Sequence, residues 1–129
     1  MPDIITHSML KIAWAGMLLG VASGAIIGLW FAREDWMGGY SSWRRRLTRL
    51  GHISFFGLGF INFFFAFTHH ILPLEPVWAL RGAWAFGIGA ATMPAVCFLC
   101  AWYKPLRHLF FIPVGGVTIG ILSILAGWP

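Results

Sequence analysis

Four long stretches of this chain contain no charged residue, and no other feature constrains the fold as strongly. They cover residues 12–32, 50–72, 82–103 and 109–128. A bilayer core of ~30 Å requires roughly 20 residues of helix, and each stretch reaches that length. Because an unpaired backbone amide is costly in lipid, stretches of this kind fold as helices. The sequence therefore predicts an integral membrane protein with four spanning helices.

The connections between these stretches are short, so we expect consecutive helices to pack antiparallel. Prolines at 73, 76 and 105 favour tight turns in two of the connections. The predicted fold is an all-α, integral membrane four-helix bundle with up-down-up-down order. We expect one transmembrane domain over residues 1–129, with helices at roughly 9–32, 47–72, 77–103 and 106–128 and an interfacial cytoplasmic connection at 33–46.

Basic residues predict the orientation of the chain. They gather beside the first and third connections, at Arg33, Arg44, Arg45, Arg46, Arg49, Lys104 and Arg107. Such an excess is typical of cytoplasmic loops, so we predict both termini on the outer side of a bacterial cytoplasmic (inner) membrane. The net charge of +5 is then mainly a topology signal. It suits contact with anionic lipid headgroups and does not indicate nucleic-acid binding.

The first stretch carries a glycine at every fourth position, which predicts close helix packing. The four residues are Gly16, Gly20, Gly24 and Gly28. At about 100° per residue they form one stripe of the kind called a glycine zipper, where another backbone or a flat ligand can approach. The partner of the stripe could be a helix of the same chain, a second subunit or a cofactor. The stretch is too long for a cleaved signal peptide, so we expect it to remain in the mature protein.

Two histidines, His52 and His108, each open a hydrophobic stretch beside the basic connections, and a glycine follows each, at Gly59 and Gly115. Two imidazoles at equal depth on neighbouring helices can ligate the iron of a b-type haem. Small residues beside them leave room for the flat ring. The sequence thus offers a haem site, with the simpler alternative that both histidines bond to water and headgroups at the interface.

Two arginines at similar depth complete the predicted haem site. Arg49 and Arg107 lie close in sequence to the two histidines and could pair with the haem propionates at the rim. A protein that binds no cofactor is a serious alternative.

Weaker metal-ligand candidates lie elsewhere. At the outer side these are His7, His69 and His70, for which a wet, exposed histidine pair at 69 and 70 is the simpler interpretation. The third stretch carries a candidate copper site on one helical face, at Met93, Cys97 and Cys100. Their sulfur ligands are of the type that binds monovalent copper. The simpler interpretation is that the cysteines pack in the helix bundle, where buried cysteines are common.

No catalytic arrangement is visible. The four acidic residues, Asp3, Glu34, Asp35 and Glu75, all lie outside the stretches, and no phosphate-binding or dinucleotide motif is present. We do not expect an enzyme acting on its own. We expect a small membrane subunit of a larger, respiratory or electron-transfer complex, with other membrane subunits or further copies of itself as partners. The alternatives are a cofactor-free structural or assembly subunit and a small copper-binding protein or transporter.

Overall fold

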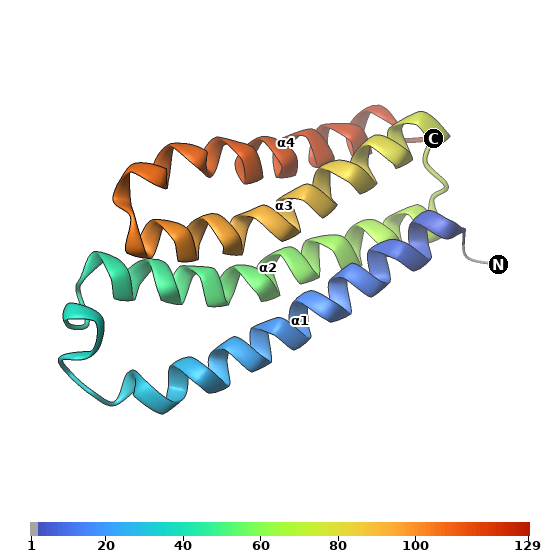
Figure 1. The fold of residues 1–129 in the computed structure, drawn as a ribbon. Coiled ribbons are helices and arrows are strands. Elements are labelled where there is room, and N and C mark those ends of the chain that lie inside the picture. The colour runs from blue at the N-terminus through green and yellow to red at the C-terminus, as the bar shows by residue number, and fades with distance from the viewer. Residues whose placement is uncertain (1–2) are drawn as a thin grey trace.

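A computed structural model describes residues 3–129, and within these residues the secondary structure is entirely helical (Figure 1). The elements are α1 (Ile4–Phe31), η1 (Trp36–Gly38), α2 (Trp43–Ile71), α3 (Pro76–Trp102), η2 (Lys104–Phe110) and α4 (Phe111–Ala126). Four segments are long and apolar enough to cross a membrane: α1, α2, α3 and the combined η2–α4 segment. The described chain is thus all-helical, with four segments that could span a membrane.

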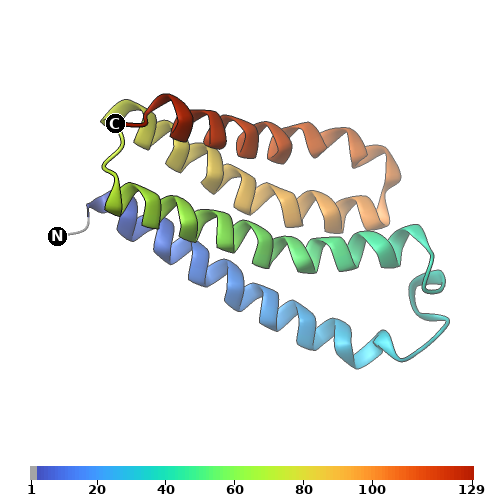
Figure 2. The ribbon, with the colours of Figure 1, turned by 180° about the vertical axis from the view of Figure 1, so that it is seen from behind.

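The four long helices lie in a row that follows their order in the chain, as Figures 1 and 2 show from opposite sides. The main contacts join α1 to α2, α2 to α3 and α3 to α4, with a smaller contact between α1 and α3. The two outer helices therefore bury few of their residues. Of the spanning residues, 11% in α1 and 17% in α4 are buried inside the protein, against 39% in α2 and 44% in α3.

Side-chain caps explain why two helices begin earlier than expected. The Asp3 carboxylate accepts a hydrogen bond from the backbone N–H of Thr6 at 2.7 Å, so α1 begins at Ile4. The Ser42 hydroxyl accepts one from the N–H of Arg45 at 3.2 Å, so α2 begins at Trp43. A cap satisfies backbone donors that the first turn of a helix leaves free.

The first connection is held in place by one buried arginine. The Arg45 side chain is only 2% exposed, and its guanidinium donates hydrogen bonds to the carbonyls of Phe31 at 2.6 Å and Arg33 at 3.1 Å. It also lies over the rings of Phe31, Trp36 and Tyr40, at 4.6, 5.5 and 5.3 Å. Free carbonyls and the helix dipole make the end of α1 electronegative. Arg45 therefore fastens the end of α1 to the start of α2.

Glycines allow close approach at two helix pairs. At the α1–α2 contact, an added Cβ at Gly16 would lie 3.4 Å from the Phe55 carbonyl oxygen, and one at Gly20 would lie 2.6 Å from the Phe56 ring. At the α3–α4 contact, an added Cβ at Gly116 would lie 2.8 Å from the carbonyl oxygen of Ala85. Backbone atoms cannot move aside as a flexible side chain can, so Gly116 sets the spacing of α3 and α4.

The adjacent glycines of α4 supply a matched test. Gly116→Ala should lower the free energy of unfolding by about 1–3 kcal/mol, because the methyl group overpacks against the α3 backbone. Gly115→Ala should be neutral or slightly stabilising, because nothing lies within 4 Å of a Cβ there. Reversible unfolding in mixed micelles, followed by circular dichroism, measures both. Equal losses for the two variants would contradict the close α3–α4 contact.

Candidate functional site

The helices α1 and α2 diverge toward η1, as Figures 1 and 2 show. A crevice of about 340 Å³ lies between the two helices. Its lining residues come from both helices: Gly24, Ile27, Gly28, Phe31, Arg49, His52 and Ile53. The structure thus brings together four residues singled out in the sequence, namely Gly24, Gly28, Arg49 and His52. This crevice is the candidate functional site.

His52 forms the deep end of the crevice. Its ring lies against Gly24, where an added Cβ would lie 2.6 Å from Cε1 and 3.2 Å from Nε2. The other ring nitrogen, Nδ1, is 3.0 Å from the hydroxyl of Ser23. The hydroxyl is also 3.1 Å from the Gly20 carbonyl; when it donates there, it accepts from Nδ1–H, and Nε2 of that tautomer keeps a free lone pair.

Arg49 lies at the wide end of the crevice. Its guanidinium is 4.2 Å from the centre of the Tyr40 ring and donates to the Tyr40 carbonyl across a long 3.4 Å. The side chain is half-buried. Within residues 3–129 the one arginine–carboxylate pair joins Arg33 to Asp35, so Arg49 retains both its charge and free N–H donors. The crevice therefore combines apolar walls with a cationic rim.

The second half of the predicted haem site lies elsewhere. His108 and Arg107 are exposed on η2, which packs mainly on α3 and α4, while His52 faces α1. Gly59 packs against Ala13 of α1, and Gly115 has open space beside it. The structure does not bring the two histidines together, so a haem held between them in one chain has no geometric support.

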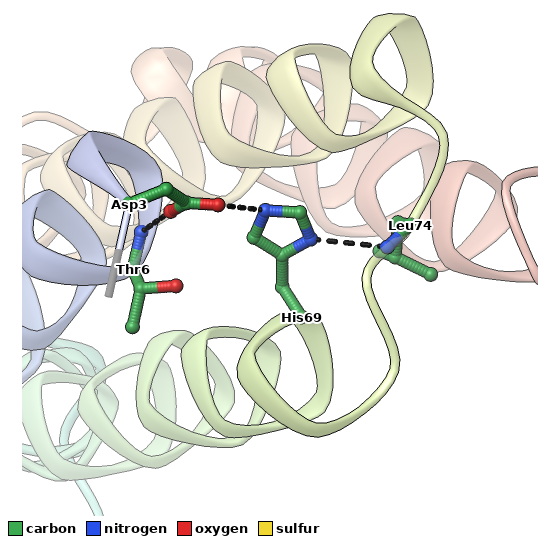
Figure 3. Close-up of polar contacts among 4 residues, drawn as sticks. All are labelled: Asp3, Thr6, His69 and Leu74. Atoms are coloured by element: carbon green, nitrogen blue, oxygen red, sulfur yellow. Dashed lines mark hydrogen bonds and ion pairs between the residues drawn. The ribbon is translucent and has the colours of Figure 1, made fainter. Parts of the chain in front are cut away.

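His69, expected to be exposed, is instead buried at 6% exposure in a polar cluster at the other end of the molecule (Figure 3). The backbone N–H of Leu74 donates to its Nδ1 at 3.2 Å. Its Nε2 therefore carries the proton and donates to Asp3 at 2.6 Å. His69 thus joins the start of α1, the end of α2 and the α2–α3 connection.

Sequence reasoning missed Asp3 as the partner of His69. Burial alone would raise the pKa of the Asp3 carboxyl, but hydrogen bonds from Thr6 and the neighbouring His69 outweigh it and lower the pKa below its usual 3.8. The available signal was the position of Asp3 three residues before Thr6, ahead of an apolar run, which is typical of a helix cap.

The remaining candidates lie at the surface or in the packing between helices. His7 and His70 are exposed. Cys97 and Cys100 are fully buried in an apolar cluster against which Met93 packs. Across residues 3–129, no group of three or more His, Cys, Asp or Glu side chains could hold a metal ion. Met93, Cys97 and Cys100 of α3 thus take part in the packing between helices.

Asn62 forms only a weak hydrogen bond between helices. The residue is completely buried, and its amide donates to the Leu58 carbonyl of its own helix at 2.8 Å and to the Phe86 carbonyl of α3 at 3.5 Å. Its Oδ1 atom has no hydrogen-bond partner within the described chain. Asn62 therefore places a buried polar side chain, with one oxygen unpaired among residues 3–129, in the packing between α2 and α3.

Comparison of the chain with known protein families, curated proteins and solved structures found no match.

The Asp3–His69 pair generates a pH-dependent prediction. Asp3→Ala should cost about 1–2 kcal/mol near neutral pH by removing a helix cap, whereas Asp3→Asn retains one acceptor oxygen, which can still cap the N–H of Thr6, and should cost less. Because the folded-state pKa of Asp3 is lowered below 3.8, its ionised form stabilises the fold fully above pH 3.8, and that contribution is lost as the pH falls from there through the folded-state pKa. Hydrogen exchange in the first turn of α1 measures the effect.

Once the pH falls below the folded-state pKa of Asp3, the wild type and Asp3→Asn should therefore become alike in that exchange rate. A difference of unchanged size across the pH range would show that the Asp3 charge does not contribute.

Proposed function

We propose that this chain is a small accessory subunit of a larger membrane complex, crossing the bilayer four times with both termini on the outer side. The observation that carries the proposal is the row of helices, which leaves α1 and α4 with shallowly buried spans at its two edges. Leu18 and Leu29 of α1 are 69% and 78% exposed, and Leu125 of α4 is 66% exposed. Such faces suit packing against other membrane helices.

The distribution of charge supports the orientation. The first and third connections meet at one end of the molecule, where Lys104 lies 5.1 Å from the Trp43 ring and Arg44 lies 4.9 Å from the Trp102 ring. By the positive-inside rule this end is cytoplasmic. The termini lie together at the opposite end, because Asp3 bonds to His69, and the backbone N–H of Glu75 donates to the Gly127 carbonyl at 3.2 Å.

A respiratory subunit that holds haem b at His52 is the second form of the proposal. It is favoured by one observation, the free Nε2 of His52 beside Gly24 in a crevice with Arg49 at its rim. Because His108 is exposed on another side of the molecule, the opposite axial ligand would come from a partner chain. The buried cysteines do not favour a copper-binding function.

Photo-crosslinking tests the accessory role. A photoreactive residue replacing Leu18 in α1 or Leu122 in α4, both exposed positions, should give a discrete protein adduct in native membranes. The same residue in place of the buried Ala66 should give none. Gel electrophoresis and mass spectrometry identify the adducts. If both exposed positions gave lipid adducts alone, the accessory role would be rejected.

An absorption spectrum tests the haem form. The mildly solubilised complex should show a Soret shift with sharp α and β bands on reduction, as a low-spin haem does. His52→Ala should abolish these bands by removing an axial ligand, while His70→Ala, at an exposed position, should leave them intact. A colourless complex, or bands unchanged in His52→Ala, would reject haem ligation by His52 without affecting the crosslinking result.

A further inference from the structure

We propose that the α1–α2 crevice is a binding site for one anionic phospholipid of the leaflet at the basic end of the molecule. The lipid phosphate bonds to Arg49, and its glycerol region lies in the wedge between the two helices. This site does not depend on the accessory role, but it is an alternative to the haem form, since a lipid and a haem would occupy the same crevice and bond to the same Nε2 of His52.

The crevice opens where the glycines of α1 cease to contact α2. At Gly24, the His52 ring fills the space between the helices, whereas an added Cβ at Gly28, one turn further along α1, would meet nothing within 4 Å. The crevice is thus a wedge that is closed at His52 and open toward the basic end. Ile27 and Ile53 provide apolar walls on either side, which suit the first carbons of acyl chains.

The charge of the crevice selects the ligand. Of its lining side chains, those of Arg49 and His52 carry polar atoms. The Arg49 guanidinium has one long hydrogen bond, to Tyr40, and no carboxylate partner within residues 3–129. A planar guanidinium with free donors matches the oxygens of a phosphate. An anionic headgroup supplies this partner from the bilayer itself.

The depth of the two polar groups matches the layers of a lipid head. Arg49 precedes His52 by three residues on α2, so it lies about 4.5 Å closer to the membrane surface. Within the described chain, no protein group bonds to Nε2 of His52, and this atom is free to bond a lipid hydroxyl. One lipid headgroup can therefore bond to both side chains, through its phosphate to Arg49 and through a hydroxyl to His52.

Native mass spectrometry of the purified full-length chain tests the site. With equal amounts of phosphatidylglycerol and phosphatidylcholine present, the wild type should retain one phosphatidylglycerol in preference. Arg49→Gln should reduce that retention by about fivefold, the effect of losing one cation near a membrane surface. Gly28→Leu should reduce it by filling the wedge, and it should fold because the position faces open space.

Two control variants separate the site from general effects. Arg46→Gln removes the same charge at an exposed position outside the crevice lining and should reduce retention much less than Arg49→Gln, because Arg46 does not face the bound headgroup. Gly57→Leu adds the same bulk to α2 where nothing lies within 4 Å and should leave retention unchanged. Equal losses in Arg46→Gln and Arg49→Gln, or full retention in both Arg49→Gln and Gly28→Leu, would overturn the proposal.

Inorganic phosphate distinguishes the source of the anion. Millimolar phosphate should leave the bound phosphatidylglycerol in place, because the ion lacks the acyl chains that contact Ile27 and Ile53. Displacement of the lipid by phosphate alone would show a free-anion site and overturn the lipid assignment. Equal retention of phosphatidylcholine and phosphatidylglycerol by the wild type would likewise overturn the role of Arg49.

Discussion

The close approach of helix backbones is the interaction on which the rest of this structure depends. In lipid, apolar side chains gain little by leaving the solvent, so helices associate mainly through van der Waals contact and hydrogen bonds. Glycine allows these contacts to include the backbone. Gly16 and Gly20 bring α1 onto α2, and Gly116 brings α4 onto α3. The inner pair, α2 and α3, shares an apolar core that includes Phe65 and Phe86.

The crevice is a consequence of where these contacts stop. Gly24 is the last glycine of α1 that meets α2, through the His52 ring, and beyond it Gly28 faces open space. The helices still remain connected at their ends, because Arg45 of α2 bonds to the final carbonyls of α1. The contact of Gly24 with His52 closes the crevice at one end, and the hydrogen bonds of Arg45 hold α1 and α2 together at the other end. These two contacts fix the width of the crevice between them.

Much of the fold could be predicted from the sequence because spanning length, helix formation and the distribution of charge are local properties. The four apolar segments and the gathering of basic residues at one end follow directly from composition along the chain. The positions of Gly16, Gly20 and Gly24 on one face of α1 likewise follow from a period of four. These features do not depend on how distant segments meet.

The candidate site was harder to predict because it depends on direction as well as depth. His52 and Gly51 are neighbours in sequence, yet His52 faces α1 while Gly51 faces Phe98 of α3. Equal spacing in two stretches predicts equal depth, but it does not fix which helix each side chain meets. His108 lies in the 3₁₀ segment η2, whose rotation per residue differs from that of an α-helix. The matched spacing therefore did not produce facing side chains.

The pairing of the Asp3 carboxylate with His69 could not be predicted from local pattern at all. The two residues are 66 positions apart, and their contact depends on α1 and α2 being antiparallel and in a particular register. Each residue alone reads as a solvent-exposed polar group at a membrane surface. Only the packed helices create the buried pocket in which the imidazole has two fixed partners.

The row of helices has a consequence for how the chain assembles. Each long helix packs chiefly on the one that precedes or follows it in the chain, so most contacts close over short stretches of sequence. Contacts of this kind form early and require little search. The hydrogen bond from the Glu75 N–H to the Gly127 carbonyl can form only after α4 has been made, because Gly127 follows that helix while Glu75 precedes α3.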